Sequence, residues 1–122
     1  MNYTQTKVLL IEDNEGDRRF LKDVLHIACP AKYEITEAST LNEGMGLLTN
    51  ASFDIVLTDL NLPDADGLNT LTHIQSCDQS IPIVVLSGQN SDEVALQIVQ
   101  MGAQDYLVKG QGDGHLISRA ID

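Results

Sequence analysis

Apolar residues along this chain occur in two kinds of segment, and the two kinds alternate. Short continuous runs such as Lys7 to Ile11 are typical of strands that are covered on both faces. Longer segments carry apolar residues at steps of three and four, the spacing of an amphipathic helix. The pattern predicts strands at 7–11, 33–38, 55–59, 83–86 and 105–108, and helices at 17–28, 40–48, 67–76, 90–101 and from 113 onward.

Capping residues flank several of these helices. Asn14 is placed to cap the first helix, and Thr40 with Glu43 forms a capping box before the second, which Gly44 and Gly46 weaken. The first helix is expected to bury a stripe made of Phe20, Leu21, Val24, Leu25 and Ala28. The fourth helix, which Gly102 ends, has more apolar surface than one buried face requires.

The regular alternation of strand and helix determines the expected fold class. Segments ordered in this way form a parallel sheet, joined by right-handed crossovers, with helices on both faces. We therefore expect an α/β fold with a single doubly wound five-stranded parallel sheet.

Length and charge narrow the function classes. The chain has 122 residues, which suits one domain with its own core. With 18 acidic and 7 basic residues, its formal net charge is -11, which repels nucleic acid and anionic membranes. No apolar run reaches the roughly 18 residues of a membrane span, and the first residues lack the apolar core of a signal peptide. We expect a cytoplasmic protein without membrane insertion and without direct nucleic-acid binding.

The two cysteines, Cys29 and Cys77, form no metal-binding or redox motif. Both follow apolar helical patterns, so we expect reduced, half-buried packing residues.

Chemically active side chains follow the strands at their carboxyl ends, which converge on one edge of a parallel sheet. Glu12 and Asp13 follow the first strand, Asp59 ends the third, Ser87 the fourth and Lys109 the fifth. Taken singly, each is an ordinary turn, loop or surface residue, but together they form a chemical set. Neighbouring carboxylates repel one another unless a cation lies among them, and oxygen ligands without His or Cys favour Mg²⁺ or Mn²⁺.

The same set suits a phosphoryl group. A lysine ammonium supplies a point charge and a serine hydroxyl a short donor for phosphoryl oxygens. A carboxylate can act as the nucleophile and form an acyl phosphate. The set therefore indicates phosphoryl transfer onto Asp59.

With the segments VLLIEDN, TDLNLPDADG, VVLSG and DYLVKG in this order, the chain resembles the receiver domain of two-component response regulators over residues 1–122. The resemblance implies a flavodoxin-like strand order, 2-1-3-4-5. It also implies that Asp59 accepts a phosphoryl group from the phosphohistidine of a sensor histidine kinase or a histidine phosphotransfer protein. Such a phosphoacceptor assists its own phosphorylation and dephosphorylation and is not an enzyme acting on a separate substrate.

The resemblance also assigns a metal site. Asp13 would bind Mg²⁺ together with Asp59 and the backbone carbonyl of Asn61, while Glu12 would hold a coordinated water. Asn61 and Gln89 lie where an attacking water would be positioned, so we expect them to tune the lifetime of the phosphate.

The remaining implied roles concern the switch. Lys109 would pair with Asp59 and later with the phosphoryl group, which Ser87 would move to bind. Tyr106 would turn inward as Ser87 moves, and a partner would read the face formed by the fourth helix, fifth strand and last helix.

One departure from the family is clear, because Gly110 stands where a proline in a cis bond usually follows the lysine. We expect a trans Lys109–Gly110 bond, since a cis bond before a non-proline residue costs about 2.5–4 kcal/mol. Asp64 and Asp66 are interpreted as loop and helix-cap residues. No role is expected for the three histidines, His26, His73 and His115.

Two other functions compete with the phosphoacceptor switch. An aspartyl-phosphate phosphohydrolase is suggested by the Asp-x-Asn at the end of a strand, although that chemistry usually sits on the first strand and needs a cap. A phosphorylation-independent interaction domain would normally have lost the acceptor Asp or the Lys. The unfinished last helix is expected in a stand-alone receiver or in a segment with an output or kinase domain downstream.

Overall fold

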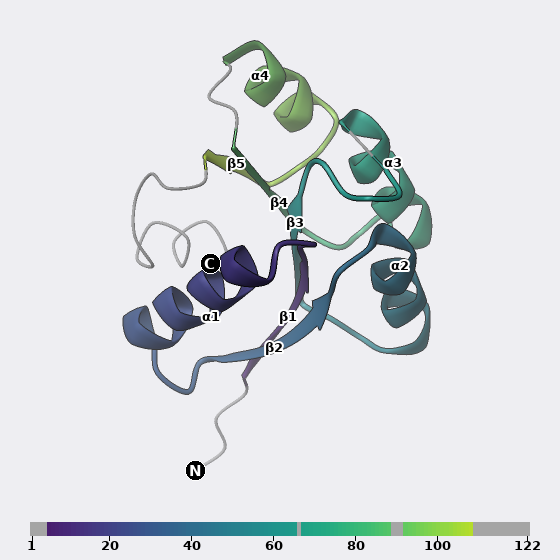
Figure 1. The fold of residues 1–122 in the computed structure, drawn as a ribbon. Helices are drawn as coiled ribbons and strands as arrows, with labels where there is room; N and C mark the ends of the chain where they lie inside the picture. Colours follow the sequence, from purple (N-terminus) through teal and green to yellow (C-terminus); the bar gives the residue numbers. More distant parts are fainter. Residues whose placement is uncertain (1–4, 66, 89–91, 109–122) are drawn as a thin grey trace.

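A sheet of five parallel strands runs through the centre of the structure, a computed structural model that describes residues 5–65, 67–88 and 92–108 (Figure 1). The strands are β1 (Thr6–Ile11), β2 (Tyr33–Ala38), β3 (Ile55–Asp59), β4 (Ile83–Ser87) and β5 (Asp105–Val108). They lie in the order β2-β1-β3-β4-β5. The doubly wound α/β sheet and its flavodoxin-like order are confirmed.

Helices cover both faces of this sheet. Helix α1 (Glu15–Ala28) lies on one face, and α2 (Leu41–Asn50), α3 (Leu68–Cys77) and α4 (Asp92–Gln100) lie on the other (Figure 1). Successive strand residues point to opposite faces, so Val8 and Leu10 of β1 pack toward α1 while Leu9 and Ile11 pack toward α2 and α3. The central strands β1, β3 and β4 are therefore apolar on both sides.

Helix α1 starts at its predicted cap, because the side chain of Asn14 accepts a hydrogen bond from the Asp17 N–H at 2.9 Å. Leu21 and Leu25 of the expected stripe are buried, but Phe20 is 51% exposed, so its predicted burial is wrong. Phe20 is rotated by about 100° from Leu21 around the helix, which carries its side chain off the buried stripe.

Helix α2 shows why a glycine occurs in a helix interior. Its first turn is capped by the hydroxyl of Thr40, which accepts from the Glu43 N–H at 3.1 Å as predicted. The Glu43 carboxylate accepts from the hydroxyl of Ser39 at 2.7 Å. Gly44 is buried against β1, and a Cβ atom there would lie 2.5 Å from Cδ1 of Ile11. The close approach of α2 to the sheet thus favours glycine at this position.

The apolar surplus of α4 is confirmed, because Leu96 is 60% and Val99 49% exposed while Ile98 is fully buried. Gly102, with φ of +104°, ends this helix as predicted. Both cysteines are free thiols; Cys29 is half-buried, but Cys77 is exposed at the last turn of α3, so the expectation for Cys77 is wrong. Within the described ranges, no helix has the length and apolarity to cross a bilayer.

Candidate functional site

Glu12, Asp13 and Asp59 meet where the carboxyl ends of two central strands lie side by side. Strand β1 pairs with β3 in a register that sets Ile11 opposite Thr58, one residue before each acidic group begins. The Glu12 N–H donates to the carbonyl of Ala38 at 2.9 Å, so hydrogen bonding to β2 continues past the end of β1. The sheet itself therefore brings the three carboxylates together.

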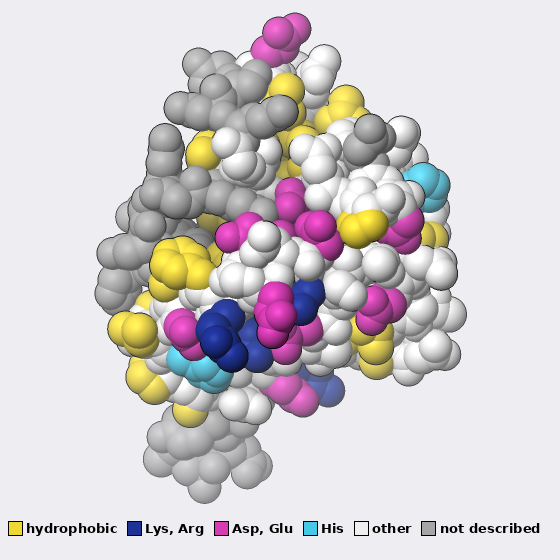
Figure 2. All heavy atoms as spheres, in the orientation of Figure 1, with side chains coloured by type: hydrophobic (Ala, Val, Ile, Leu, Met, Phe, Trp, Pro, Cys, Tyr) yellow, Lys and Arg dark blue, Asp and Glu magenta, His cyan; other side chains and the backbone are white. Residues whose placement is uncertain are grey.

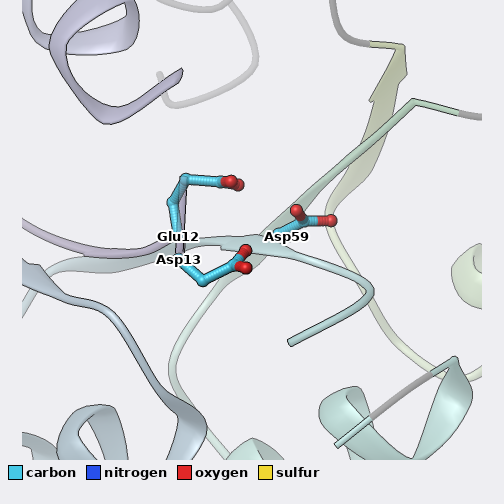
Figure 3. Close-up of side chains that lie close together, drawn as sticks. All are labelled: Glu12, Asp13 and Asp59. Atoms are coloured by element: carbon cyan, nitrogen blue, oxygen red, sulfur yellow. The ribbon is translucent and has the colours of Figure 1, made fainter. Parts of the chain in front are cut away.

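The three carboxylates project toward a common space (Figure 3). One ligand oxygen from each lies within 4.8 Å of the others. Glu12 is fully buried and Asp59 is 8% exposed, whereas Asp13 is exposed. The cluster thus has a protected inner side and an outer side that a ligand can reach.

This donor set fits a hard divalent cation. All three groups are carboxylates, the oxygen ligands that Mg²⁺ and related ions prefer. Ligands of one Mg²⁺ ion are about 3–4 Å apart, so oxygens that all lie within 4.8 Å of one another can come to share an ion through small side-chain movements. A space-filling view shows acidic side chains near the middle of this face, with Lys and Arg side chains grouped below them (Figure 2).

Arg18, which the sequence analysis did not single out, holds the main chain of the acidic pair. Its Nη1 donates to the carbonyl oxygen of Glu12 at 2.8 Å, and its Nε lies 3.4 Å from a carboxylate oxygen of Glu37. Lys22 lies 3.0 Å from the other oxygen of Glu37. The Glu12 carboxylate also accepts from the Asn14 N–H at 3.2 Å. Arg18 is a basic residue near the start of α1, a few positions after the acidic pair in the chain. That position is the signal that could have identified it.

The loop after β3 is tied to Asp59 and to α3 by its own hydrogen bonds. The Asn61 N–H donates to Oδ1 of Asp59 at 3.1 Å, and Oδ1 of Asn61 accepts from the Gly67 N–H at 3.2 Å. The buried hydroxyl of Thr70 donates to the Leu60 carbonyl at 2.8 Å. Asn61 is therefore held in place immediately beside the candidate acceptor.

Asp64, interpreted from the sequence with Asp66 as a loop or helix-cap residue, lies in the loop after β3 and caps α2. Its two oxygens accept from the N–H groups of Leu41 at 2.8 Å and Asn42 at 2.9 Å. Partial desolvation raises the pKa of Asp64, but these hydrogen bonds and others from the backbone outweigh it and hold the pKa below its ordinary value.

Ser87 and Tyr106 lie at neighbouring positions on β4 and β5. In the pairing of β4 with β5, Tyr106 lies opposite Val85. Side chains alternate between the two faces along a strand, so Ser87 lies on the same face of the sheet as Val85. Ser87 is fully buried and Tyr106 is half-buried against the core on the α4 side. The structure thus brings these two residues to one face near the acidic cluster's sheet edge.

Several predicted positions lie outside the described residues: Lys109 with the Lys109–Gly110 bond, Gln89, Asp66, His115 and the last helix from residue 113. Of the other histidines, His26 is exposed and His73 lies 2.8 Å from the Asn69 carbonyl through Nδ1.

Curated regulatory proteins resemble this chain in sequence. KDP operon transcriptional regulatory protein KdpE of Escherichia coli K12 is 32% identical over 93% of this chain and 49% of its own length. Transcriptional regulatory protein PhoP of the same strain is 34% identical over 84% of the chain and 45% of its own length. The chain thus spans about half the length of these curated relatives.

A solved response regulator protein from Burkholderia pseudomallei, described with a phosphorylated aspartic acid, a calcium ion and citrate, superposes with a TM-score of 0.80. It is 27% identical, and the match covers 97% of this chain and 67% of that one. The family model of the response regulator receiver domain matches residues 8–121, nearly the whole chain. The chain belongs to the response regulator receiver domain family.

Proposed function

We propose that this chain is a phosphoacceptor switch in which Asp59 receives a phosphoryl group from the phosphohistidine of a sensor histidine kinase or a histidine phosphotransfer protein. The observation that carries the proposal is the cluster of Glu12, Asp13 and Asp59, with ligand oxygens within 4.8 Å of one another at the carboxyl end of the central strands. The Burkholderia relative, whose description includes a phosphorylated aspartic acid, supports the same chemistry here.

The transfer balances as a simple displacement. A carboxylate oxygen of Asp59 attacks the phosphorus atom, an O–P bond forms, and the P–N bond to the donor imidazole breaks. The electron pair of that bond returns to the imidazole nitrogen, which leaves with the partner protein. The hydrogen bond from the Asn61 N–H to Oδ1 orients the Asp59 carboxylate for this attack.

Charge around the acceptor has to be offset, because two further carboxylates stand beside it. Asp13, Asp59 and the carbonyl of Asn61 would hold Mg²⁺ or Mn²⁺, with Glu12 fixing a coordinated water. When bound, the cation supplies positive charge against the carboxylates and the phosphoryl oxygens. Lys109 is proposed to pair with Asp59 and later with the phosphoryl group.

The signal would leave the site through Ser87 and Tyr106. Ser87 is proposed to bind the new phosphoryl group, and Tyr106 to follow it inward. Ser87 is buried and Tyr106 half-buried on the same face of the sheet, which supports a coupling of the two side chains. The α4, β5 and last-helix face would then present a changed surface to a partner. Asn61 and Gln89 are proposed to tune the lifetime of the phosphate.

The wider context is also a proposal. The relatives' names describe transcriptional regulatory proteins, and the matched region makes up about half of each. We propose a receiver over residues 1–122 that works in the cytoplasm and acts on an output or kinase domain, with any nucleic-acid binding left to that domain.

Intact-mass measurement after incubation with Mg²⁺ and a small acyl phosphate tests the acceptor. The wild type is expected to gain one acid-labile phosphoryl group, and an excess of chelator should prevent the gain. Asp59→Asn should gain none, whereas Asp54→Asn, at the opposite end of β3, should behave as wild type. A wild type that stays unmodified, or one that steadily hydrolyses an added phosphoester, would contradict the proposal.

A further inference from the structure

Asp64 joins the loop between β3 and α3 to the first turn of α2, and we propose that it is a positioning residue for the cation site. Its Oδ1 accepts from the Leu41 N–H at 2.8 Å and its Oδ2 from the Asn42 N–H at 2.9 Å. Each oxygen has its own donor, so the carboxylate is held at two points. The inference rests on the proposed function, because the same loop carries Asn61.

Helix α2 is itself fixed to the strand that carries the acidic pair. Leu41 is 4% exposed, and Gly44 packs so closely on Ile11 that a Cβ atom would overlap its side chain. Ile11 is fully buried and directly precedes Glu12. The bond from Asp64 to α2 therefore connects the loop to the body that also sets the position of Glu12 and Asp13.

The segment between Asn61 and Asp64 is short and internally bonded, so it can transmit this constraint. Leu62 and Ala65 exchange two backbone hydrogen bonds, at 2.7 and 3.3 Å, and Leu62 is only 7% exposed. Oδ1 of Asn61 accepts from the Gly67 N–H at 3.2 Å. Asp64 thus fixes the spacing between the Asn61 carbonyl and the carboxylates at the end of β1. Both groups belong to the proposed cation site, so its geometry depends on that spacing.

A simpler explanation is that Asp64 only stabilises α2, and the chain contains a matched control for it. Thr40 caps the same turn by accepting from the Glu43 N–H at 3.1 Å, but it lies outside the β3–α3 loop. Removing either cap weakens the start of α2. Only the loss of Asp64 also removes the hydrogen bonds that join α2 to the loop that carries Asn61.

Titration of the unphosphorylated protein with Mg²⁺, followed by backbone amide NMR shifts, separates the two explanations without any phosphodonor. Asp64→Ala is expected to weaken Mg²⁺ binding about tenfold, the scale seen when residues that orient metal ligands are lost. Thr40→Ala is expected to bind as wild type. Asp64→Asn, whose amide oxygen can accept one of the two hydrogen bonds, should lie between wild type and Asp64→Ala.

Equal Mg²⁺ affinity in Asp64→Ala and wild type overturns the positioning role and leaves the proposed function intact. An equal loss in Asp64→Ala and Thr40→Ala overturns it as well, because helix stability would then explain the effect. Should Asp64→Ala not fold, the comparison of Asp64→Asn with Thr40→Ala decides in the same way. A wild type that binds no Mg²⁺ refutes the proposed cation site and this inference together.

Discussion

Gly44 offers a sharp test of how closely α2 packs on the central sheet. A Cβ atom at this position would lie 2.5 Å from Cδ1 and 2.9 Å from Cγ1 of Ile11. Carbon atoms in favourable contact are about 3.5–4.0 Å apart, so the helix or the Ile11 side chain would have to move by about 1 Å. Ile11 is fully buried on a central strand, which leaves its side chain little room to move.

The free energy of unfolding follows from two opposing effects. Replacing glycine by alanine inside a helix stabilises by about 0.5–1 kcal/mol, while overpacking a filled core costs about 1–3 kcal/mol. For Gly44→Ala the second effect dominates, and we expect a net loss of about 1 kcal/mol. Gly46 lies two residues on in the same helix, and a Cβ atom there would meet nothing within 4 Å. Gly46→Ala should therefore be more stable than wild type by about 0.5–1 kcal/mol, the gain from replacing glycine by alanine in a helix.

Urea denaturation followed by circular dichroism measures both variants against wild type. The midpoints should rank Gly46→Ala above wild type and wild type above Gly44→Ala, with unchanged m-values. Helix propensity cancels between the two variants, so their difference, about 1–3 kcal/mol, isolates the contact with Ile11. Equal stability of the two variants would refute the close packing of α2 on β1.

Other predictions concern the residues around the acidic cluster. Arg18→Met should destabilise by about 1–2 kcal/mol more than Lys22→Met in the same denaturation assay, because Arg18 alone also bonds the Glu12 carbonyl; equal losses would count against that bond. Gly67→Ala should cost about 1–3 kcal/mol through its φ of +56°, since no atom crowds the site; an unchanged midpoint would show that the turn adapts. The lowered pKa of Asp64 means that its hydrogen bonds stabilise the fold above the unfolded pKa of about 4 and lose that effect as pH falls through the folded value. The difference in unfolding free energy between wild type and Asp64→Ala should therefore be largest near neutral pH and should shrink in acid. Denaturation at a series of pH values measures it, and a difference independent of pH would contradict this.

The fold could be predicted because its signals are local. Continuous apolar runs and helical spacing appear within single segments, and their alternation leads to a parallel sheet. The meeting of Glu12, Asp13 and Asp59 followed from the same step, since the carboxyl ends of parallel strands share an edge.

Contacts between distant segments could not be predicted in this way. Asp64 caps a helix 23 residues earlier in the chain, and the sequence contains no sign of which helix end the loop approaches. Helix propensity alone describes Gly44 as a residue that weakens α2. The reason for a glycine there is its contact with Ile11, which only the structure shows. Phe20 had the right spacing for burial, but the boundary of the buried stripe depends on how α1 sits on the sheet.

Chemical trapping of the acyl phosphate tests the central claim most directly. After incubation with Mg²⁺ and a small acyl phosphate, borohydride reduces an aspartyl phosphate to homoserine, and peptide mass spectrometry then locates the converted residue. We predict homoserine at position 59 in the wild type, with the other acidic residues of the cluster unchanged. Conversion at Asp13 in place of Asp59, or no conversion anywhere in a folded wild-type protein, would contradict the assignment of Asp59 as the phosphoryl acceptor.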